Sequence, residues 1–569
     1  MLRIATLAVA ALATAMFATS AQAGRGDDGQ LKILYWQAPS ILNPFLSGGT
    51  KDVDASSIIV EPLAHYDEKG NIVAALAADV PTVANGGVAK DLKSITWKLK
   101  KGVVWSDGTP FTAADVEFTA DYCLHPEGGC NAIDRFQDVT SVKATDSHTI
   151  VITFGVAKPF PYGPFVGSTS PVIQKKQFEN CMGAKAPECT TENFGTIGTG
   201  AFKVKEFRPN DVVLYEANDK YRVADQPAFS SILLKGGGDA VSAARAVLET
   251  GEFDYAWNLQ VEPEILSTMA KAGKGKVISA FGTSVERLMV QLTNARPEAG
   301  ENRGVYMDGK NPHPFLSDKA VRRALSMSID RAILVDAGYG PAGQVTCNVL
   351  PAPAIYASTA NDWCKTQDIA GANKLLDDAG WKRGSDGVRA KDGVRLSILY
   401  QTSTNSVRQG TQALVKQMWA EIGVEAELKN ISASVFFGGD QASPDTFQKF
   451  FSDIEMYTNN FNGTDPENYM LRWTCDKMPS PKNQWIGQNM SRYCDPAYDA
   501  LGAKLAQTAA LEDRAKIAKK MNDMLIEHGA MIPLIHRGNV AAHTNTLGGV
   551  RQNVWDATPW NIQEWHRMK

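Results

Sequence analysis

The stretch from Trp97 to Tyr122, WKLKKGVVWSDGTPFTAADVEFTADY, says more about the fold than any other part of the sequence. Apolar and polar residues alternate around Trp97 and Leu99, which predicts a strand buried on one face. Ser106-Asp107-Gly108 then predicts a tight turn, because glycine takes backbone angles that other residues avoid. Thr112 follows as a helix N-cap whose hydroxyl can accept a bond from the first turn. One short segment therefore predicts a strand, a turn and a helix in that order.

As an ordered string, this segment resembles the signature of the peptide/nickel/opine class (family 5) of extracytoplasmic solute-binding proteins of ABC importers. In that class a strand, a DGTPF turn and a TAxDVxF helix follow one another. Further blocks resemble the same family in the same order. They are EPLAHYDEKG (61–70), the hairpin GTGAFKVKEFRPND (198–211), the segment AVSAARAVLETGEFDY (240–255), which reads as a helix ending at Gly251 and leading into a strand, the helix FLSDKAVRRALSMSIDRAILV (315–335), KLLDDAGW (374–381) and YCDPAYDAL (493–501). The resemblance covers roughly residues 31–569.

The resemblance implies an α/β fold of the two-lobed, hinged periplasmic-binding-protein type (type II, cluster C-like), with an accessory subdomain in the first lobe. It implies these boundaries: lobe 1 at 24–285 with the accessory subdomain at 67–193, lobe 2 at 286–531, and a return to lobe 1 at 532–569. Hinge strands are expected near Gln291 and Pro533. Residues 396–428 read as strand, amphipathic helix and strand, and we expect the two strands to pair in parallel.

The first 23 residues read as a signal peptide. Arg3 supplies a positive start, residues 4–17 are apolar, and Ala21-Gln22-Ala23 is a small-residue cleavage site. The apolar run is shorter than the roughly 20 residues of a membrane-spanning helix. A soluble periplasmic protein is therefore expected, with a retained N-terminal anchor as the alternative.

The eight cysteines fall into neighbouring pairs without the C-x-x-C spacing of a zinc or redox site. In an oxidising compartment the simplest expectation is four local disulfides. These are Cys123–Cys130, Cys181–Cys189, Cys347–Cys364 and Cys475–Cys494.

Composition excludes some partners. The formal net charge is −4 and no basic block or basic–aromatic interleaving occurs, so nucleic acid is a poor candidate. No tandem repeat is visible, and a monomer without a cofactor is expected. The resemblance adds the membrane permease of an ABC importer as the protein partner.

The ligand residues expected from the second lobe lie in two segments. In dipeptide-type relatives, an Asp in a W-x-x-D-Y strand holds the ammonium of the ligand, and here Asn460 stands at that position, between Asn459 and Phe461. Close relatives also carry an Arg after the strand that matches 396–400, whereas this chain has Gln401-Thr402-Ser403-Thr404-Asn405. Arg408 could substitute for that Arg, or it could face solvent.

Neutral amides lack the opposite charge that makes a bond to an ion strong. A compact free dipeptide is therefore less favoured than a larger, blocked or sugar-like solute. The alternative is that Asn460 and Thr402 only cap turns and the true anchors lie elsewhere.

Aromatic and amide residues that follow two predicted strands are the candidates from the first lobe. They are Trp36 and Gln37 after the first strand, and Trp257 and Asn258 after the strand that follows Gly251. A flat ring loses little entropy when it packs on a ligand. Each Trp is equally well explained as a core residue, which is the expectation for Trp97, Trp105 and Trp419.

Signatures of enzymes are missing from the sequence. There is no G-x-S-x-G elbow, no H-E-x-x-H helix and no phosphate-loop lysine. The expected function is a periplasmic receptor that delivers a peptide or peptide-like solute to an ABC importer. One alternative is a receptor of the same fold for a sugar-like, opine or nickel-chelate ligand, and the other is a secreted hydrolase. For nickel, His536 is the only candidate histidine near a hinge.

Overall fold

The computed structural model describes residues 24–568, and the predicted signal peptide lies outside these residues. A single mixed sheet of 11 strands runs through both halves of this part of the chain. In spatial order its strands are β17 (Glu425–Ile431), β16 (Ser397–Ser403), β18 (Ile454–Asn459), β11 (Gly275–Val290), β19 (Met531–Thr544), β10 (Tyr255–Ala256), β1 (Gln30–Tyr35), β9 (Ser231–Gly236), β8 (Val212–Ala217) and β7 (Phe202–Arg208), with β12 (Gly343–Val345) pairing with β19 off this path.

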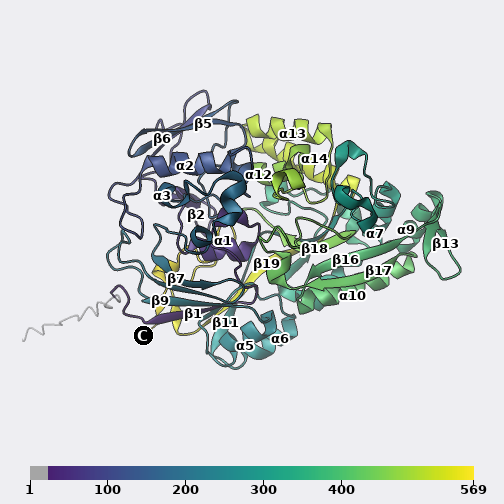
Figure 1. The fold of residues 1–569 in the computed structure, drawn as a ribbon. Coiled ribbons are helices and arrows are strands. Elements are labelled where there is room, and N and C mark those ends of the chain that lie inside the picture. The colour runs from purple at the N-terminus through teal and green to yellow at the C-terminus, as the bar shows by residue number, and fades with distance from the viewer. Residues whose placement is uncertain (1–23, 569) are drawn as a thin grey trace, which may run out of the picture.

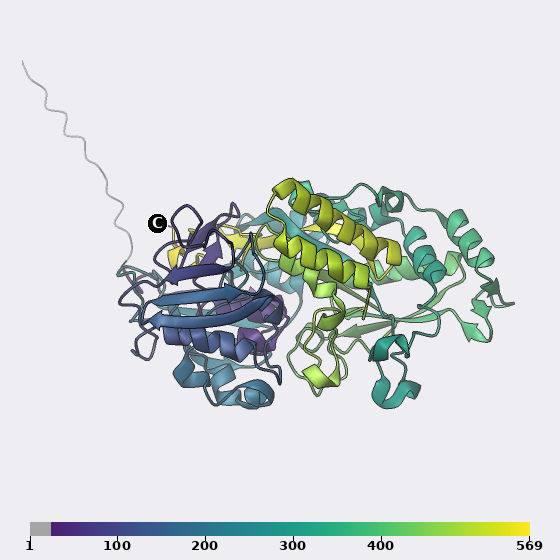
Figure 2. The ribbon, with the colours of Figure 1, turned by 90° about the horizontal axis from the view of Figure 1, so that it is seen from above.

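Two long strands join the halves. β11 and β19 pair antiparallel from Gly275 opposite Thr544 to Met289 opposite Met531, with register shifts between Phe281 and Val285 and after Glu286. One end of this pair adjoins β10, and the other end adjoins β18. Figure 1 shows the purple and blue N-terminal segments on one side of this crossing and the green segments on the other, and Figure 2 shows the same two halves from above.

Helices and small sheets cover the central sheet. The α-helices are α1 (Thr50–Ser57), α2 (Ala113–Cys123), α3 (Lys175–Phe178), α4 (Thr190–Phe194), α5 (Ala240–Leu248), α6 (Pro263–Ala270), α7 (Lys319–Met327), α8 (Arg331–Gly338), α9 (Ile369–Asp378), α10 (Ser406–Glu421), α11 (Ala433–Phe436), α12 (Glu467–Met470), α13 (Pro496–Gln507) and α14 (Leu511–His528). The small sheets are β4 (Ser94–Lys98) with β6 (Thr149–Phe154) and β5 (Val139–Asp146), β2 (Ala64–Tyr66) with β3 (Ile72–Ala74), β13 (Lys382–Arg383) with β14 (Arg389–Lys391) and β15 (Val394–Arg395), and β20 (Leu547–Gly548) with β21 (His566–Arg567).

The segment from 97 to 122 forms the predicted strand, turn and helix. β4 buries Trp97, and the turn at Gly108 has a φ of 86°. α2 begins after Thr112, whose backbone N–H donates to the Asp115 carboxylate at 2.9 Å. The Thr112 side chain accepts in turn from the backbone N–H of Asp115, so the two residues form a capping box and the predicted N-cap is confirmed. Trp97, Trp105 and Trp419 are all buried, as expected.

The second half also follows its sequence patterns, with one difference. β16, α10 and β17 form the expected unit, and the two strands pair in parallel. The segment 315–335, expected to be one helix, instead contains α7 and the first part of α8. Asp330 causes the break, because its carboxylate accepts from the N–H groups of Ala332 and Ile333 and so starts a new helix.

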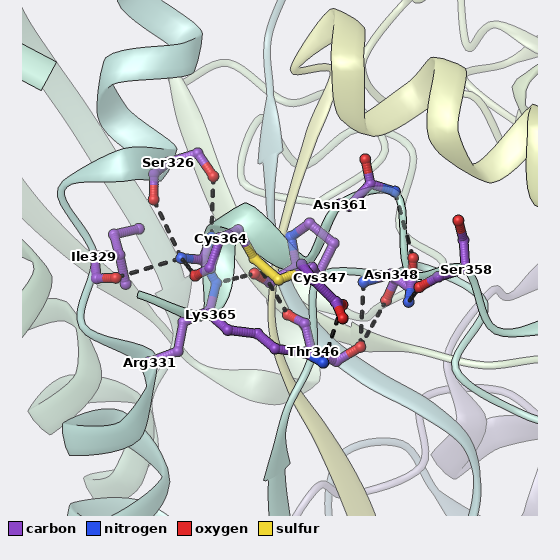
Figure 3. Close-up of a disulfide and its surroundings, with 12 residues drawn as sticks. Ser326, Ile329, Arg331, Thr346, Cys347, Asn348, Ser358, Asn361, Cys364 and Lys365 are labelled. Carbon is purple, nitrogen blue, oxygen red and sulfur yellow. Dashed lines mark hydrogen bonds and ion pairs between the residues drawn. A yellow bond between two sulfur atoms is a disulfide. The ribbon is translucent and has the colours of Figure 1, made fainter. Parts of the chain in front are cut away.

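All eight cysteines form disulfides between sequence neighbours, as expected. Figure 3 shows the Cys347–Cys364 bridge, which closes a loop beside the start of α8. The buried Arg331 donates to the carbonyl of Cys364 at 2.9 Å and to that of Pro533 on β19 at 2.8 Å. The bridged loop is therefore tied to one of the two crossing strands.

Removing this bridge should destabilise the protein. The sequence separation of Cys347 and Cys364 is 17, and a loop of that size is worth about 3 kcal/mol in the chain-entropy treatment. We expect the C347S/C364S variant to melt at a lower temperature than the unreduced wild type. The C123S/C130S variant, with a separation of 7, should lose about 1 kcal/mol less. An unchanged melting temperature for C347S/C364S, or free thiols in the denatured and unreduced wild type, would contradict this assignment.

Candidate functional site

A cleft lies where the two halves of the sheet meet. Its wall takes residues from α1 and the loops after β1 and β10 on one side, and from β18, α10 and the segment 437–490 on the other. β19 contributes Arg537 and Asn539 between them. The wall is rich in charge, with four arginines and three aspartates. How each charge is compensated decides what the cleft can bind.

The guanidinium of Arg408 is paired inside the protein. Asn405 caps α10 and orients its first turn, and Arg408 Nε donates to Glu286 on β11 at 2.8 Å. Glu286 also accepts from Thr458 and from Gln260. Burial opposes the ionisation of Glu286, but the charge and hydrogen bond of Arg408, the charge of Arg537 and the bond from Thr458 together outweigh it and lower the pKa of this carboxyl.

Arg537, on β19, also lines the cleft. Its Nη2 donates to Asn258 Oδ1 at 2.6 Å, and its Nη1 donates to Thr458 Oγ1 at 3.2 Å. No carboxylate of residues 24–568 lies at ion-pair distance from it. Burial lowers the pKa of Arg537, which still leaves it a cation. Arg537 thus connects the loop after β10 to β18 across the cleft floor.

A polar seam joins the two halves beside the cleft. Arg472, after α12, pairs with Asp134 at 3.4 Å and donates to the carbonyl of Asn460 at 3.0 Å. Lys158 pairs with Glu467, and both side chains are almost fully buried. A buried pair of this kind adds little net stability over an apolar contact, but leaving one partner unpaired is costly.

Among the four arginines of the cleft wall, Arg135 is the one whose positive charge has the fewest partners within the described residues. It belongs to a short 3-10 helix, Ile133–Phe136, and is only 4% exposed, yet it lines the cleft. Within residues 24–568 its guanidinium makes no hydrogen bond and no ion pair. Burial lowers its pKa, and the charges of Asp134 and Asp556 partly offset that effect. A buried guanidinium with five free donors is suited to an anionic group.

Six of the nine expected ligand residues line the cleft, whereas contact with a ligand stays a prediction. Those on the wall are Gln37, Trp257, Asn258, Arg408, Asn459 and Asn460. The indole of Trp257 stacks on Tyr35 at 4.6 Å, and the second alternative for Arg408, that it faces solvent, does not hold.

The other three point into the protein. Trp36 is packed in the core near α5 and donates to the carbonyl of Asn258 at 2.8 Å. Thr402 donates to the carbonyl of Met456 at 2.6 Å within the sheet. Phe461 stacks on Tyr469 at 4.8 Å. Side chains alternate between the two faces of a strand, so a residue in or next to a strand can point toward the cleft or into the core. Its position in the sequence does not say which.

Several cleft residues carry no recognisable signal in the sequence. These are Asp54, Asp134, Arg135, Arg472, Arg537 and Asp556. Asp134 and Arg135 lie in an irregular segment, and Asp556 lies near the C-terminus, so no periodic pattern marks them. Their proximity exists only in three dimensions.

No histidine of the described residues lines the cleft, so none is placed there to bind nickel. His536 Nε2 donates to the carbonyl of Gly282 at 2.8 Å, and the ring does not line the cleft. Within residues 24–568, the one group of side chains with metal-ligand geometry is Cys181, Cys189 and Glu192. Its two cysteines are joined in a disulfide. No helix of the described residues is long and apolar enough to cross a membrane.

Fold and cleft together define a two-lobed α/β solute-binding protein. A family model for bacterial extracellular solute-binding proteins, family 5 Middle, matches residues 71–480, and the chain belongs to this family. It is an ABC transporter substrate-binding protein and not an enzyme.

Similar proteins agree with this assignment. Protein XP55 of Streptomyces lividans is 29% identical over 437 residues, which cover 75% of this chain and 72% of XP55. The oligopeptide-binding protein AppA of Bacillus subtilis is 25% identical over 407 residues, covering 70% and 68%. Its solved structure in complex with a nonapeptide has a TM-score of 0.81 at 21% identity, covering 96% of this chain and 100% of AppA. NikZ from Campylobacter jejuni in complex with Ni(L-His) has a TM-score of 0.77 at 22% identity, covering 95% and 100%.

The Glu286–Arg408 pair should be essential for stability. Removing one partner of a buried ion pair typically costs about 3–5 kcal/mol, so we expect E286Q to lower the free energy of unfolding at pH 7 by that order. Because the pKa of Glu286 is lowered on folding, its contribution is present above the ordinary carboxyl range and is lost as the pH falls through the folded value.

The difference between wild type and E286Q should therefore shrink when urea unfolding is repeated from pH 7 down to pH 3. E427Q, which neutralises an exposed glutamate on β17, serves as the control and should stay close to wild type. A pH-independent difference would refute the assigned charge of Glu286.

Proposed function

We propose that this protein is the receptor of an ABC importer for peptides or peptide-like solutes that carry a carboxylate. The observation that carries the proposal is Arg135, a buried guanidinium in the cleft wall without a partner in residues 24–568. Burying a charge costs free energy unless a partner offsets it, so an anionic group of the solute would remove this cost. The complex of AppA with a nonapeptide supports peptides as the solute class.

The proposed mechanism is closure around the solute. Lobe 1 comprises residues 24–285 and 532–569, with the accessory subdomain at 67–193, and lobe 2 comprises residues 286–531. β11 and β19 cross between them, and the hinge lies near Gln291 and Pro533. A solute that touches both walls binds the closed form better and shifts the population toward it. The permease in the inner membrane then recognises the closed form of the monomeric, periplasmic receptor.

Contacts across the seam support a closing motion of this kind. Asp134 and Lys158 lie in the proposed accessory subdomain, and their partners Arg472 and Glu467 lie in the proposed lobe 2. Arg135 directly follows Asp134. An anion at Arg135 would therefore lie beside a contact that forms only when the lobes approach.

Replacing Arg135 should weaken binding of free peptides in particular. A hydrogen bond to a charged group contributes about 1.5–3 kcal/mol, so we expect R135Q to lose about 10- to 100-fold in affinity for peptides with a free carboxylate. The corresponding peptide amides should bind wild type and R135Q equally. Isothermal titration with a set of di- to nonapeptides, each as acid and amide, provides the measurement.

R208Q is a matched control, because Arg208 is an exposed arginine on β7 that is not part of the cleft wall. It should bind like the wild type. If R135Q loses affinity equally for peptide acids and peptide amides, the substitution acts on the structure and Arg135 is not a carboxylate anchor. Failure of every peptide to bind the wild type would refute peptides as the solute class.

A further inference from the structure

Asp54, on α1, differs from the other carboxylates of the cleft wall. Asp134 is paired with Arg472. Asp556 accepts from the N–H groups of Tyr66, Ser168 and Ala557 and from the amide of Asn462, all at 2.8–3.0 Å. Asp54 accepts only two long bonds, from Tyr35 Oη at 3.3 Å and from the N–H of Thr558 at 3.4 Å. Within the described residues it has no cationic partner.

The neighbouring acid on the same helix shows what a structural aspartate looks like here. Asp52 accepts from the backbone N–H of Ser40 and the hydroxyl of Ser47, each at 2.6 Å, and pairs with Lys51 at 2.8 Å. Asp52 thus holds the segment around α1 together and does not line the cleft. Asp54 is as deeply buried, at 1% exposed, but it lines the cleft and lacks such partners.

The surroundings of Asp54 suit a cation. Tyr35 donates to its carboxylate and stacks on Trp257 with an interplanar angle of 10°. Trp257 and Tyr255 also line the cleft. A carboxylate beside aromatic faces offers a cation both opposite charge and favourable contact with π-electrons.

The titration of Asp54 agrees with an unpaired buried acid. Burial above all, with a smaller effect from the charge of Asp556, raises the pKa of Asp54 to about 7 against the opposing bonds from Thr558 and Tyr35. The titratable groups that face it are Tyr35, Tyr255 and Asp556, and none of them is a cation at neutral pH. A cation from outside would favour the ionised form.

We propose that Asp54 is the acidic anchor of the cleft and binds an organic cation, the ammonium or guanidinium of a solute whose carboxylate lies at Arg135. The proposal rests on the proposed function and adds to it that the solute is zwitterionic. Asn460, in the second lobe, is neutral and supplies no negative charge for a cation. The proposal places that negative charge on Asp54, in the first lobe.

The test compares wild type, D54N and the control D219N with two pools of peptides. D219N removes the same charge from an exposed position outside the cleft. One pool is a tryptic digest of casein, and the other is the same digest acetylated at every amine. Peptides bound at equilibrium are quantified by mass spectrometry after dialysis, and melting curves check that D54N is folded. D54S gives the same comparison if D54N does not fold.

We expect wild type and D219N to bind free peptides, and D54N to bind them more than tenfold more weakly. Acetylation should abolish the difference between wild type and D54N for peptides without arginine. If the cation is a guanidinium, acetylated peptides ending in arginine will still bind the wild type and lose affinity in D54N. If it is an ammonium, no acetylated peptide will bind tightly.

Two results would overturn the proposal, and they are distinguishable. If the wild type and D54N bind free peptides equally, or if acetylated peptides without arginine bind the wild type as tightly as its best free peptides do, the role of Asp54 is refuted and the receptor function stands. If the wild type binds no peptide from either pool, the peptide function and the assignment of Asp54 both fall.

Discussion

The pairing of β11 with β19 is the constraint on which the cleft depends. These strands run through both halves of the sheet and bring Glu286 and Arg537 to the crossing. Glu286 then holds Arg408 at the start of α10, and Arg537 holds Asn258 after β10. One pair of strands therefore positions a residue on each wall. Their register shifts fall beside Glu286, where the sheet passes from one half to the other.

Charge is distributed unevenly around this crossing. Arg408 and Arg472 have carboxylate partners within the protein, and these pairs keep the walls in register. Arg135 is buried without a carboxylate at ion-pair distance and Asp54 without a cation, so folding compensates their desolvation only in part. A protein tolerates such a cost where function gains from it, because a solute that supplies the missing charges is bound in one orientation. The two unpaired groups would thus favour one class of solute over others.

The sequence predicted local structure and the family better than it predicted the site. β4, the turn at Gly108 and α2 obey short-range patterns, as do the parallel pairing of β16 with β17 and the disulfides. The break between α7 and α8 was missed because the helical spacing continues through Asp330. Thr402 and Phe461 point inward, since a motif fixes where the backbone goes and not which face a side chain takes. Whether a charge is compensated depends on distant residues: Arg408 and Glu286 are 122 positions apart.

The disulfides have a consequence for how the chain acquires its structure. The cysteines pair in order along the sequence, the first with the second, the third with the fourth and so on, with separations from 7 to 19 residues. If the chain emerges from its N-terminus into an oxidising compartment, each second cysteine arrives while its native partner is the only unpaired thiol already exposed. Oxidation in order of emergence therefore yields the correct pairs without an isomerase, and no bridge joins residues far enough apart to restrain the two halves of the sheet.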